Sequence, residues 1–276
     1  MNAAIRKLFL INFLGGLSFY LPIFTLFLLQ KNITLPEIIF AQVFYSIAAF
    51  LAEVPTGILA DRVGHHKSVA IGYLVDFFAL LIIILLPSSI TIIFAFIIRG
   101  VSGAFTSGSK EALLYEYCQK SERTYKKDYS HMTSYEILGV AISTFIAGII
   151  LQQFGEVSYT PIMIATIIAI GIAGVLTFTL PKIHVELDTG RELFHEVKHS
   201  FALFRTSRIL VVLFLTAGLT YEGNFVLMQL YPPHMVNTHV APFFLGASLS
   251  IASLVNYFLV RHAYLIEKPL GAKNAI

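Results

Sequence analysis

The sequence predicts an all-helical protein that crosses a membrane several times. Hydrophobic residues make up 57% of the 276 residues and charged residues only 13%, and the mean hydropathy is +0.77. A soluble domain carries about a quarter charged residues, so this composition places the chain among integral membrane proteins. A net charge of +3 without a basic tract argues against a nucleic-acid partner.

Eight stretches are long and apolar enough to cross the hydrocarbon core as helices, which takes about 20 residues each. They cover residues 8–29, 37–60, 68–86, 90–112, 134–152, 160–180, 209–230 and 242–260. The first stretch is a retained span, because its apolar run exceeds the roughly 7–15 residues of a signal core and contains no small-residue cleavage site.

The positions of the basic residues support this count. If the N-terminus is cytoplasmic, seventeen of the 19 Lys and Arg residues fall on the cytoplasmic side, while Lys31 lies outside and Arg99 lies within a span. Basic residues are enriched in cytoplasmic loops. We therefore expect a multi-pass protein of the cell membrane, surrounded by the lipid bilayer, with both termini in the cytoplasm.

The spacing of the spans predicts three parts. These are an N-terminal six-helix bundle over residues 1–180, a cytoplasmic linker over 181–208, and a partial second bundle of two helices over 209–276. Apolar residues recur at helical spacing within the linker, namely Leu193, Phe194, Val197, Phe201 and Phe204. This pattern predicts an amphipathic helix on the inner face of the membrane.

The stretch GILADRVGHHK, residues 57–67, joins the second and third spans. It resembles the signature loop of the major facilitator superfamily, G-x-L-A-D-R-x-G-R-K. The matching positions are Gly57, Leu59, Ala60, Asp61, Arg62 and Gly64. His65 and His66 replace the usual basic pair, and Lys67 carries the charge one position later. The preceding EVPTG resembles a bacterial branch of the superfamily.

A second, weaker resemblance lies in the fourth span. In RGVSG, Arg99 and Gly103 match the superfamily pattern R-x-x-Q-G, with Ser102 in the Gln position. The Gly-Pro antiporter motif is missing from the fifth span, which argues against drug–proton exchange. The resemblance covers the whole chain and implies a six-helix first half followed by two helices of the second half.

The resemblance implies that the 57–67 loop is a cytoplasmic gate latching the two halves, with Glu116 as the acid at the inner end of the fourth helix. Glycines let helix ends approach closely, and Asp61 at a helix terminus can bind backbone groups or a basic partner. Charges that only fix topology would explain Arg62 and Lys67 but not Asp61. The residues of the predicted gate are Gly57, Asp61, Arg62, Gly64 and Glu116.

Four ionisable side chains fall inside spans, where each costs about 2.5–3.5 kcal/mol on insertion scales. They are the candidates for substrate contact or ion coupling: Glu53, Asp76, Arg99 and Glu222. By depth, Arg99 is within reach of Glu53 or Asp76, so a structural ion pair is an equal alternative. The resemblance places the fourth and seventh helices around the cavity, which favours Arg99 and Glu222 and makes Asp76 the weakest candidate.

Several uncharged polar residues within spans could also face the cavity. They are Asn12, Ser18, Tyr20, Thr25 and Asn224. Hydrogen bonds between helices are at least as good an interpretation of each one. The recurrence of Gly139, Ser143 and Ala147 every four residues predicts close helix packing.

A weak internal repeat appears at a shift of 206 residues. Pro36 then aligns with Pro242, and EKPLGAK at 267–273 aligns with the gate stretch as a degenerate copy. Members of the superfamily contain two similar six-helix halves, so two copies would need roughly 410 residues. We therefore expect a fragment, a partner chain that supplies the missing helices, or a chain that does not transport.

The sequence thus favours a transporter that moves a small solute by alternating access, coupled to a proton or to sodium, with no metal or cofactor. One alternative is a truncated, non-transporting membrane protein or subunit. A remote alternative is a membrane zinc protease through His195, Glu196 and His199 of HEVKH. These histidines are predicted to face solvent and lack a third ligand, which argues against an enzyme.

Overall fold

The computed structural model describes residues 2–121, 124–182 and 208–270. The described residues form helices only, and their bounds are α1 Asn2–Gly15, α2 Phe24–Gln30, α3 Leu35–Val63, α4 His65–Leu85, α5 Ser89–Thr106, α6 Ser109–Ser121, α7 Tyr125–Phe154, the 3-10 turn η1 Gly155–Ser158, α8 Tyr159–Phe178, α10 Arg208–Asn237 and α11 Phe243–Leu270. The predicted all-helical fold class is confirmed. The amphipathic helix and the HEVKH motif lie outside the described residues.

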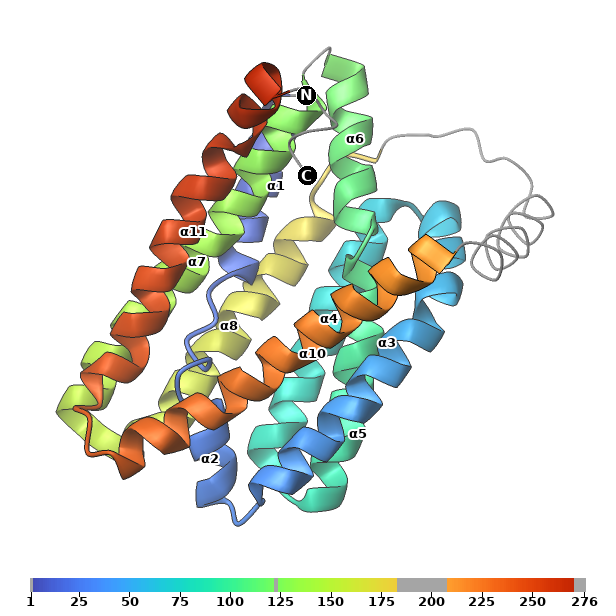
Figure 1. Cartoon of the computed structure of the whole chain (residues 1–276). Coiled ribbons are helices and arrows are strands. Elements are labelled where there is room, and N and C mark those ends of the chain that lie inside the picture. Colours follow the sequence, from blue (N-terminus) through green and yellow to red (C-terminus); the bar gives the residue numbers. More distant parts are fainter. Residues whose placement is uncertain (1, 122–123, 183–207, 271–276) are drawn as a thin grey trace.

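Helices α1 to α8 form a bundle, and α10 and α11 lie against it (Figure 1). Helices α3, α4 and α5 pack against one another, and α8 packs on α4. Helix α11 runs along α7, whereas α10 crosses the face of the bundle and contacts mainly α2 and α3. The N-terminus and the last turns of α11 lie at the same end of the bundle, which we call the N-terminal end.

Five helical stretches among the described residues are long and apolar enough to cross a membrane. Ser89–Ser121 combines α5 with α6. The stretch Tyr125–Phe178 contains both α7 and α8, so this stretch is long enough to cross the membrane twice. Many large apolar side chains on the outer surface are exposed, such as Phe50, Phe94 and Phe258. Such a surface suits contact with lipid tails, and the protein is a multi-pass membrane protein.

The ends of α3 follow from local chemistry. The backbone N–H of Thr34 donates to the Glu37 carboxylate at 2.7 Å, and a proline occupies the first turn, where its missing N–H costs nothing. At the other end, Gly64 has φ +98°, which disfavours any side chain. This glycine ends α3 and lets α4 begin at His65, so the loop motif is a tight turn between two helices.

The first span is broken, although the sequence predicted a continuous stretch over 8–29. Residues 16–23 form turns between α1 and α2. A Cβ at Gly16 would overlap the Glu136 carbonyl, so α1 packs closely on α7 at this point. The Tyr20 backbone N–H donates to Thr166 Oγ1 at 3.2 Å. Non-helical backbone at membrane depth is tolerated where the protein satisfies its polar groups in this way.

Candidate functional site

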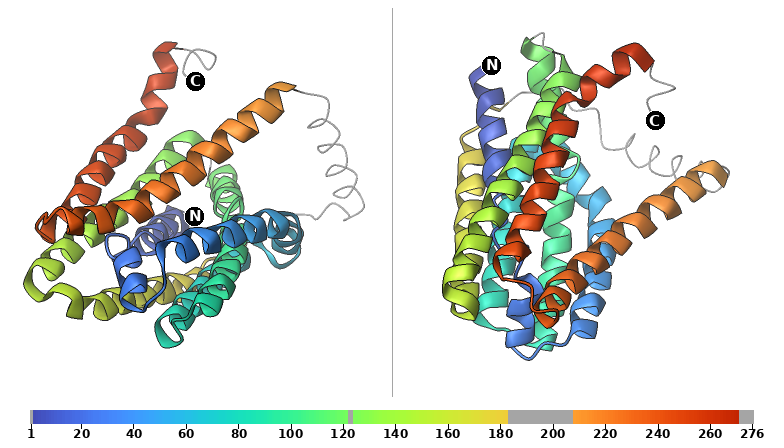
Figure 2. Two further views of the ribbon diagram at one scale, coloured as in Figure 1. Left: turned by 60° about the horizontal axis from the view of Figure 1, so that its bottom comes forward. Right: turned by 60° about the vertical axis from the view of Figure 1, so that its left-hand side comes forward.

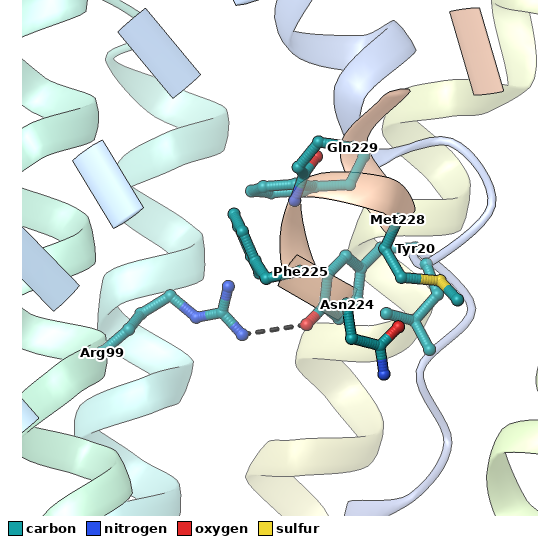
Figure 3. A pocket seen from close by; sticks show the side chains of 8 residues that line it. Tyr20, Arg99, Asn224, Phe225, Met228 and Gln229 are labelled. Carbon is teal, nitrogen blue, oxygen red and sulfur yellow. Dashed lines mark hydrogen bonds between the residues drawn. The ribbon is translucent and has the colours of Figure 1, made fainter. Parts of the chain in front are cut away.

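A pocket of about 200 Å³ lies between the bundle and α10. Its side chains come from the break in the first span, from α5 and from α10 (Figure 3). The six labelled residues are Tyr20, Arg99, Asn224, Phe225, Met228 and Gln229. Two carboxamides, one guanidinium and two aromatic rings therefore meet where the two halves of the chain face each other.

Arg99 is fixed on one side of this pocket by two partners. Its Nε donates to Asp76 Oδ1 at 2.9 Å, and its Nη2 donates to the Tyr20 hydroxyl at 2.9 Å. The guanidinium also lies 5.5 Å from the centre of the Tyr20 ring. Arg99 is therefore a member of a partly buried ion pair and also lines the pocket, and its role in substrate contact or ion coupling stays a prediction.

Glu53, the other carboxylate within reach by depth, lies elsewhere. It accepts hydrogen bonds from Ser107 Oγ at 2.8 and 3.1 Å. Ser107 is in the short break between α5 and α6. Glu53 therefore joins α3 to this break and does not contact the Arg99 pair.

Helix α10 is tied to the first half near α2. The Thr25 hydroxyl donates to Gln229 Oε1, and Ser46 Oγ donates to Glu222 Oε1 at 2.5 Å. Toward its Arg208 end, α10 diverges from the other helices (Figure 2). The candidate Glu222 thus contacts α3 beside the pocket. It belongs, with Gln229, to the contacts that join α10 to the first half of the chain.

The gate residues meet at the N-terminal end of the bundle. His65 Nε2 lies 3.7 Å from Asp61 Oδ1 and 3.4 Å from Glu116 Oε1. The structure therefore brings Asp61 and Glu116 together through a histidine that stands in place of the usual basic residue. Arg62 is exposed. Gly57 has no atom within 4 Å of the position of an added Cβ in the described part of the chain, so close approach does not explain it.

Asp61, His65 and Glu116 lie outside the expected spans and are partly buried, and this burial shifts the pKa values of His65 and Glu116. Burial, and then the charge of Asp61, raise the pKa of Glu116 to about 7. Burial lowers the pKa of His65, and Asp61 opposes that shift. Because the imidazole is neutral at pH 7, the two contacts, at 3.7 and 3.4 Å, are close polar contacts rather than full ion pairs. His65 Nδ1 is buried without a hydrogen-bond partner among the described residues.

One ion pair, half of it exposed, was not predicted. Lys110 Nζ lies 3.6 Å from Glu136 Oε1 and 5.1 Å from the centre of the Tyr73 ring. In the sequence, both charges fall two residues inside the ends of expected spans and so resemble ordinary loop charges.

An all-helical membrane protein whose two parts enclose a polar pocket has the architecture of a membrane transporter. The sequence model of the Major Facilitator Superfamily matches residues 8–276, and the chain belongs to this family of membrane transporters. The outcome agrees with the resemblance found in the 57–67 loop.

Two solved structures share the fold of this chain. The crystal structure of the nucleoside transporter NupG matches this chain with a TM-score of 0.72 and 15% sequence identity. The match covers 99% of this chain and 70% of the NupG chain. A point mutant of NupG has a TM-score of 0.71 with 18% identity, covering 98% and 70%. At these identities the likeness shows the fold alone. A search of curated proteins finds no match.

Proposed function

We propose that this protein transports a small polar solute across the cell membrane by alternating access. The two halves rock around the pocket beside Arg99, and the N-terminal end of the bundle faces the cytoplasm. The observation that carries the proposal is that one polar pocket is lined by both halves, by Arg99 from the first and Asn224 from the second. Such a pocket changes shape whenever the halves move relative to each other.

The contacts of α10 support a conformation that is closed on the outer side. Thr25 bonds Gln229 and Ser46 bonds Glu222 on one side of the pocket. Because α10 diverges from the bundle at its other end, the solute would leave toward the cytoplasm. Outward opening requires both hydrogen bonds to break, so these four residues form the outer closure in this proposal.

The charge balance of the pocket favours a neutral solute. Asp76 lies 2.9 Å from Arg99 and compensates its positive charge. The pair is therefore neutral overall and offers no unpaired charge to an ionic solute. The Asn224 carboxamide can both donate and accept hydrogen bonds, and Phe225 offers a ring face. A neutral molecule with a planar ring and polar edges suits this lining, and a nucleoside is the first member of that class to test.

Glu222 is the proposed coupling residue. It is an ionisable side chain within a span, which by itself marks an ion or proton pathway, and it shares its contact with Ser46 across the two halves. A proton or a sodium ion that neutralised this carboxylate would weaken the outer closure. Ion binding and outward opening would then be linked through one residue.

Uptake of radiolabelled uridine into proteoliposomes tests the proposal. We expect uptake above that of protein-free vesicles, and a loss of about tenfold, equivalent to about 1.4 kcal/mol, in Asn224→Leu. Leucine removes the carboxamide from the pocket. Thr220→Leu, one turn before Asn224 on the same helix, is the matched control, because Thr220 is not among the residues that line the pocket and bonds only to Thr216 of its own helix in the described contacts.

Two outcomes of this experiment would contradict the proposal. One is no uptake of uridine or of any neutral ring-containing solute in a panel of nucleosides, bases and sugars. The other is equal loss of uptake in Asn224→Leu and Thr220→Leu, which would separate transport from the pocket. Imposing a proton gradient or a sodium gradient on the same vesicles identifies the coupling ion as the one whose gradient accelerates uptake.

A further inference from the structure

The cluster at the α3–α4 turn contains two acids that share one imidazole. Asp61 lies in the last turn of α3, His65 begins α4 and Glu116 lies on α6. The side chains of His65 and Glu116 are 19% and 13% exposed, whereas that of Asp61 is 38% exposed. Three titratable groups from three helices thus meet in a site that is partly shielded from solvent. We call their contacts, which connect the α3–α4 turn to α6, the joint.

Hydrogen-bond donors are scarce in this cluster. A neutral imidazole carries a single N–H, and Nε2 is the nitrogen that faces both carboxylates. With His65 neutral and both acids ionised, one carboxylate receives the hydrogen and the other receives none. Two like charges also lie on either side of the same nitrogen, which destabilises the closed cluster.

One added proton removes both defects. A proton shared by Glu116 and His65 supplies the second donor and cancels one of the two negative charges. Because the groups interact strongly, this proton belongs to the pair and not to one residue. The closed joint therefore holds a proton more tightly than an open joint, in which water solvates the carboxylates separately.

The other charged groups around the cluster do not supply this titration. Burial, then Lys67, Lys182 and His65 itself, lower the pKa of His66, so it is neutral near pH 7. On α6, burial and Glu116 raise the pKa of Tyr117, which keeps its hydroxyl protonated. The other charges on α6 and at the neighbouring ends of α3 and α4 are the permanent cations Arg62, Lys67, Lys110 and Lys120, with Lys182 after α8, and the acid Glu111, which accepts a hydrogen bond from Tyr129. Helix α7, which packs on α6, begins with Lys126, Lys127 and Asp128, and Asp128 contacts Cys118.

We propose that Asp61, His65 and Glu116 form a proton-binding site that closes the cytoplasmic joint between the α3–α4 turn and α6 when the cytoplasm is acidic. The usual basic residue of this loop stays charged at all physiological pH values, whereas the histidine of this chain can gain and lose its proton. The proposal rests on the proposed function only for the orientation of the cluster toward the cytoplasm.

The direction of the pH effect follows from linkage. The closed joint raises the pKa of Glu116 to about 7, above the value of a solvated carboxyl. A raised pKa in the closed form means that lowering the pH through 7 favours closing, and raising the pH through 7 favours opening. The joint is thus closed at pH 6 and loosened at pH 8.

Distances between two spin labels test this site directly. Leu59 on α3 and Gln119 on α6 are both exposed and uncharged, and are replaced by labelled cysteines in the full chain, with buried Cys118 replaced by alanine. In lipid nanodiscs without solute, we expect a single short distance at pH 6. A second, longer distance should gain population as the pH is raised from 6 to 8.

Variants identify the groups responsible. Glu116→Gln keeps the acid position neutral and is expected to hold the short distance at both pH values. His66→Gln is the matched control, since His66 makes no ion pair with either acid among the described contacts, and it should retain the wild-type titration. Identical distances at pH 6 and pH 8 in the wild type, or a wild-type titration in Glu116→Gln, would overturn the proposal.

This readout is independent of transport. A distance that changes with pH in a protein without uptake would leave the proton site standing and remove the proposed function. A constant distance in a protein that transports would do the opposite.

Discussion

The Arg99→Met variant is expected to lose about 3 kcal/mol of stability, the lower end of the cost of removing one partner from a buried ion pair. The lower end applies because the side chains of Arg99 and Asp76 remain 17% and 20% exposed. Methionine fills a similar volume but leaves the Asp76 carboxylate without its 2.9 Å partner inside the membrane. Thermal unfolding in detergent measures the loss, with labelling of Cys118 as the readout because this thiol is 2% exposed in the folded protein.

The double variant Arg99→Met, Asp76→Asn separates stability from function. It removes both charges, so we expect most of the lost stability to return, since a buried pair replaced by neutral groups is often nearly neutral in its effect. Transport should stay at least tenfold below wild type (about 1.4 kcal/mol), because the pocket still lacks its guanidinium. Wild-type uptake in the double variant would show that Arg99 only neutralises Asp76 and takes no part in the solute site.

Gly246→Leu is expected to separate α11 from α7. A Cβ at Gly246 would overlap the Thr144 carbonyl and lie 2.6 Å from the Gly148 backbone nitrogen. Both are backbone atoms of α7, so no side chain can move aside, and close approach through small residues is what holds membrane helices together. We expect a loss of about 3 kcal/mol, the upper part of the range for overpacking, in the same thermal assay.

Gly218→Leu is the matched control for this change. Gly218 lies on α10, and no atom of the described residues is within 4 Å of an added Cβ there, so the thermal unfolding of this variant should be close to wild type. Equal destabilisation by both substitutions would mean that leucine acts through helix propensity or insertion. It would contradict the contact between α7 and α11 as the link between the halves.

The helical character of the apolar stretches could be predicted from hydropathy, because it depends only on the bilayer. The break at residues 16–23 could not. Its cause is tertiary, namely the close approach of Gly16 to α7 and the bond from Tyr20 to Thr166. A window of apolar residues does not contain that information.

The partners of the site residues were predictable only in part. Depth along the membrane placed Arg99 level with both Glu53 and Asp76, but the rotation of each helix decides which carboxylate it meets. Asp61 and Glu116 were paired by family resemblance. Their connection through His65 depends on the turn at Gly64. The sequence shows that a histidine replaces the usual basic residue, but it does not show where the turn directs the histidine side chain.

The central claim is that one pocket beside Arg99 opens to each side of the membrane in turn. Asn224→Cys, with Cys118 replaced by alanine, tests it through labelling by a membrane-impermeant thiol reagent applied to either side of oriented vesicles. Alternating access predicts labelling from both sides, with the transported solute protecting the cysteine from each. Labelling from one side alone, unchanged by solute or by an ion gradient, would contradict the account.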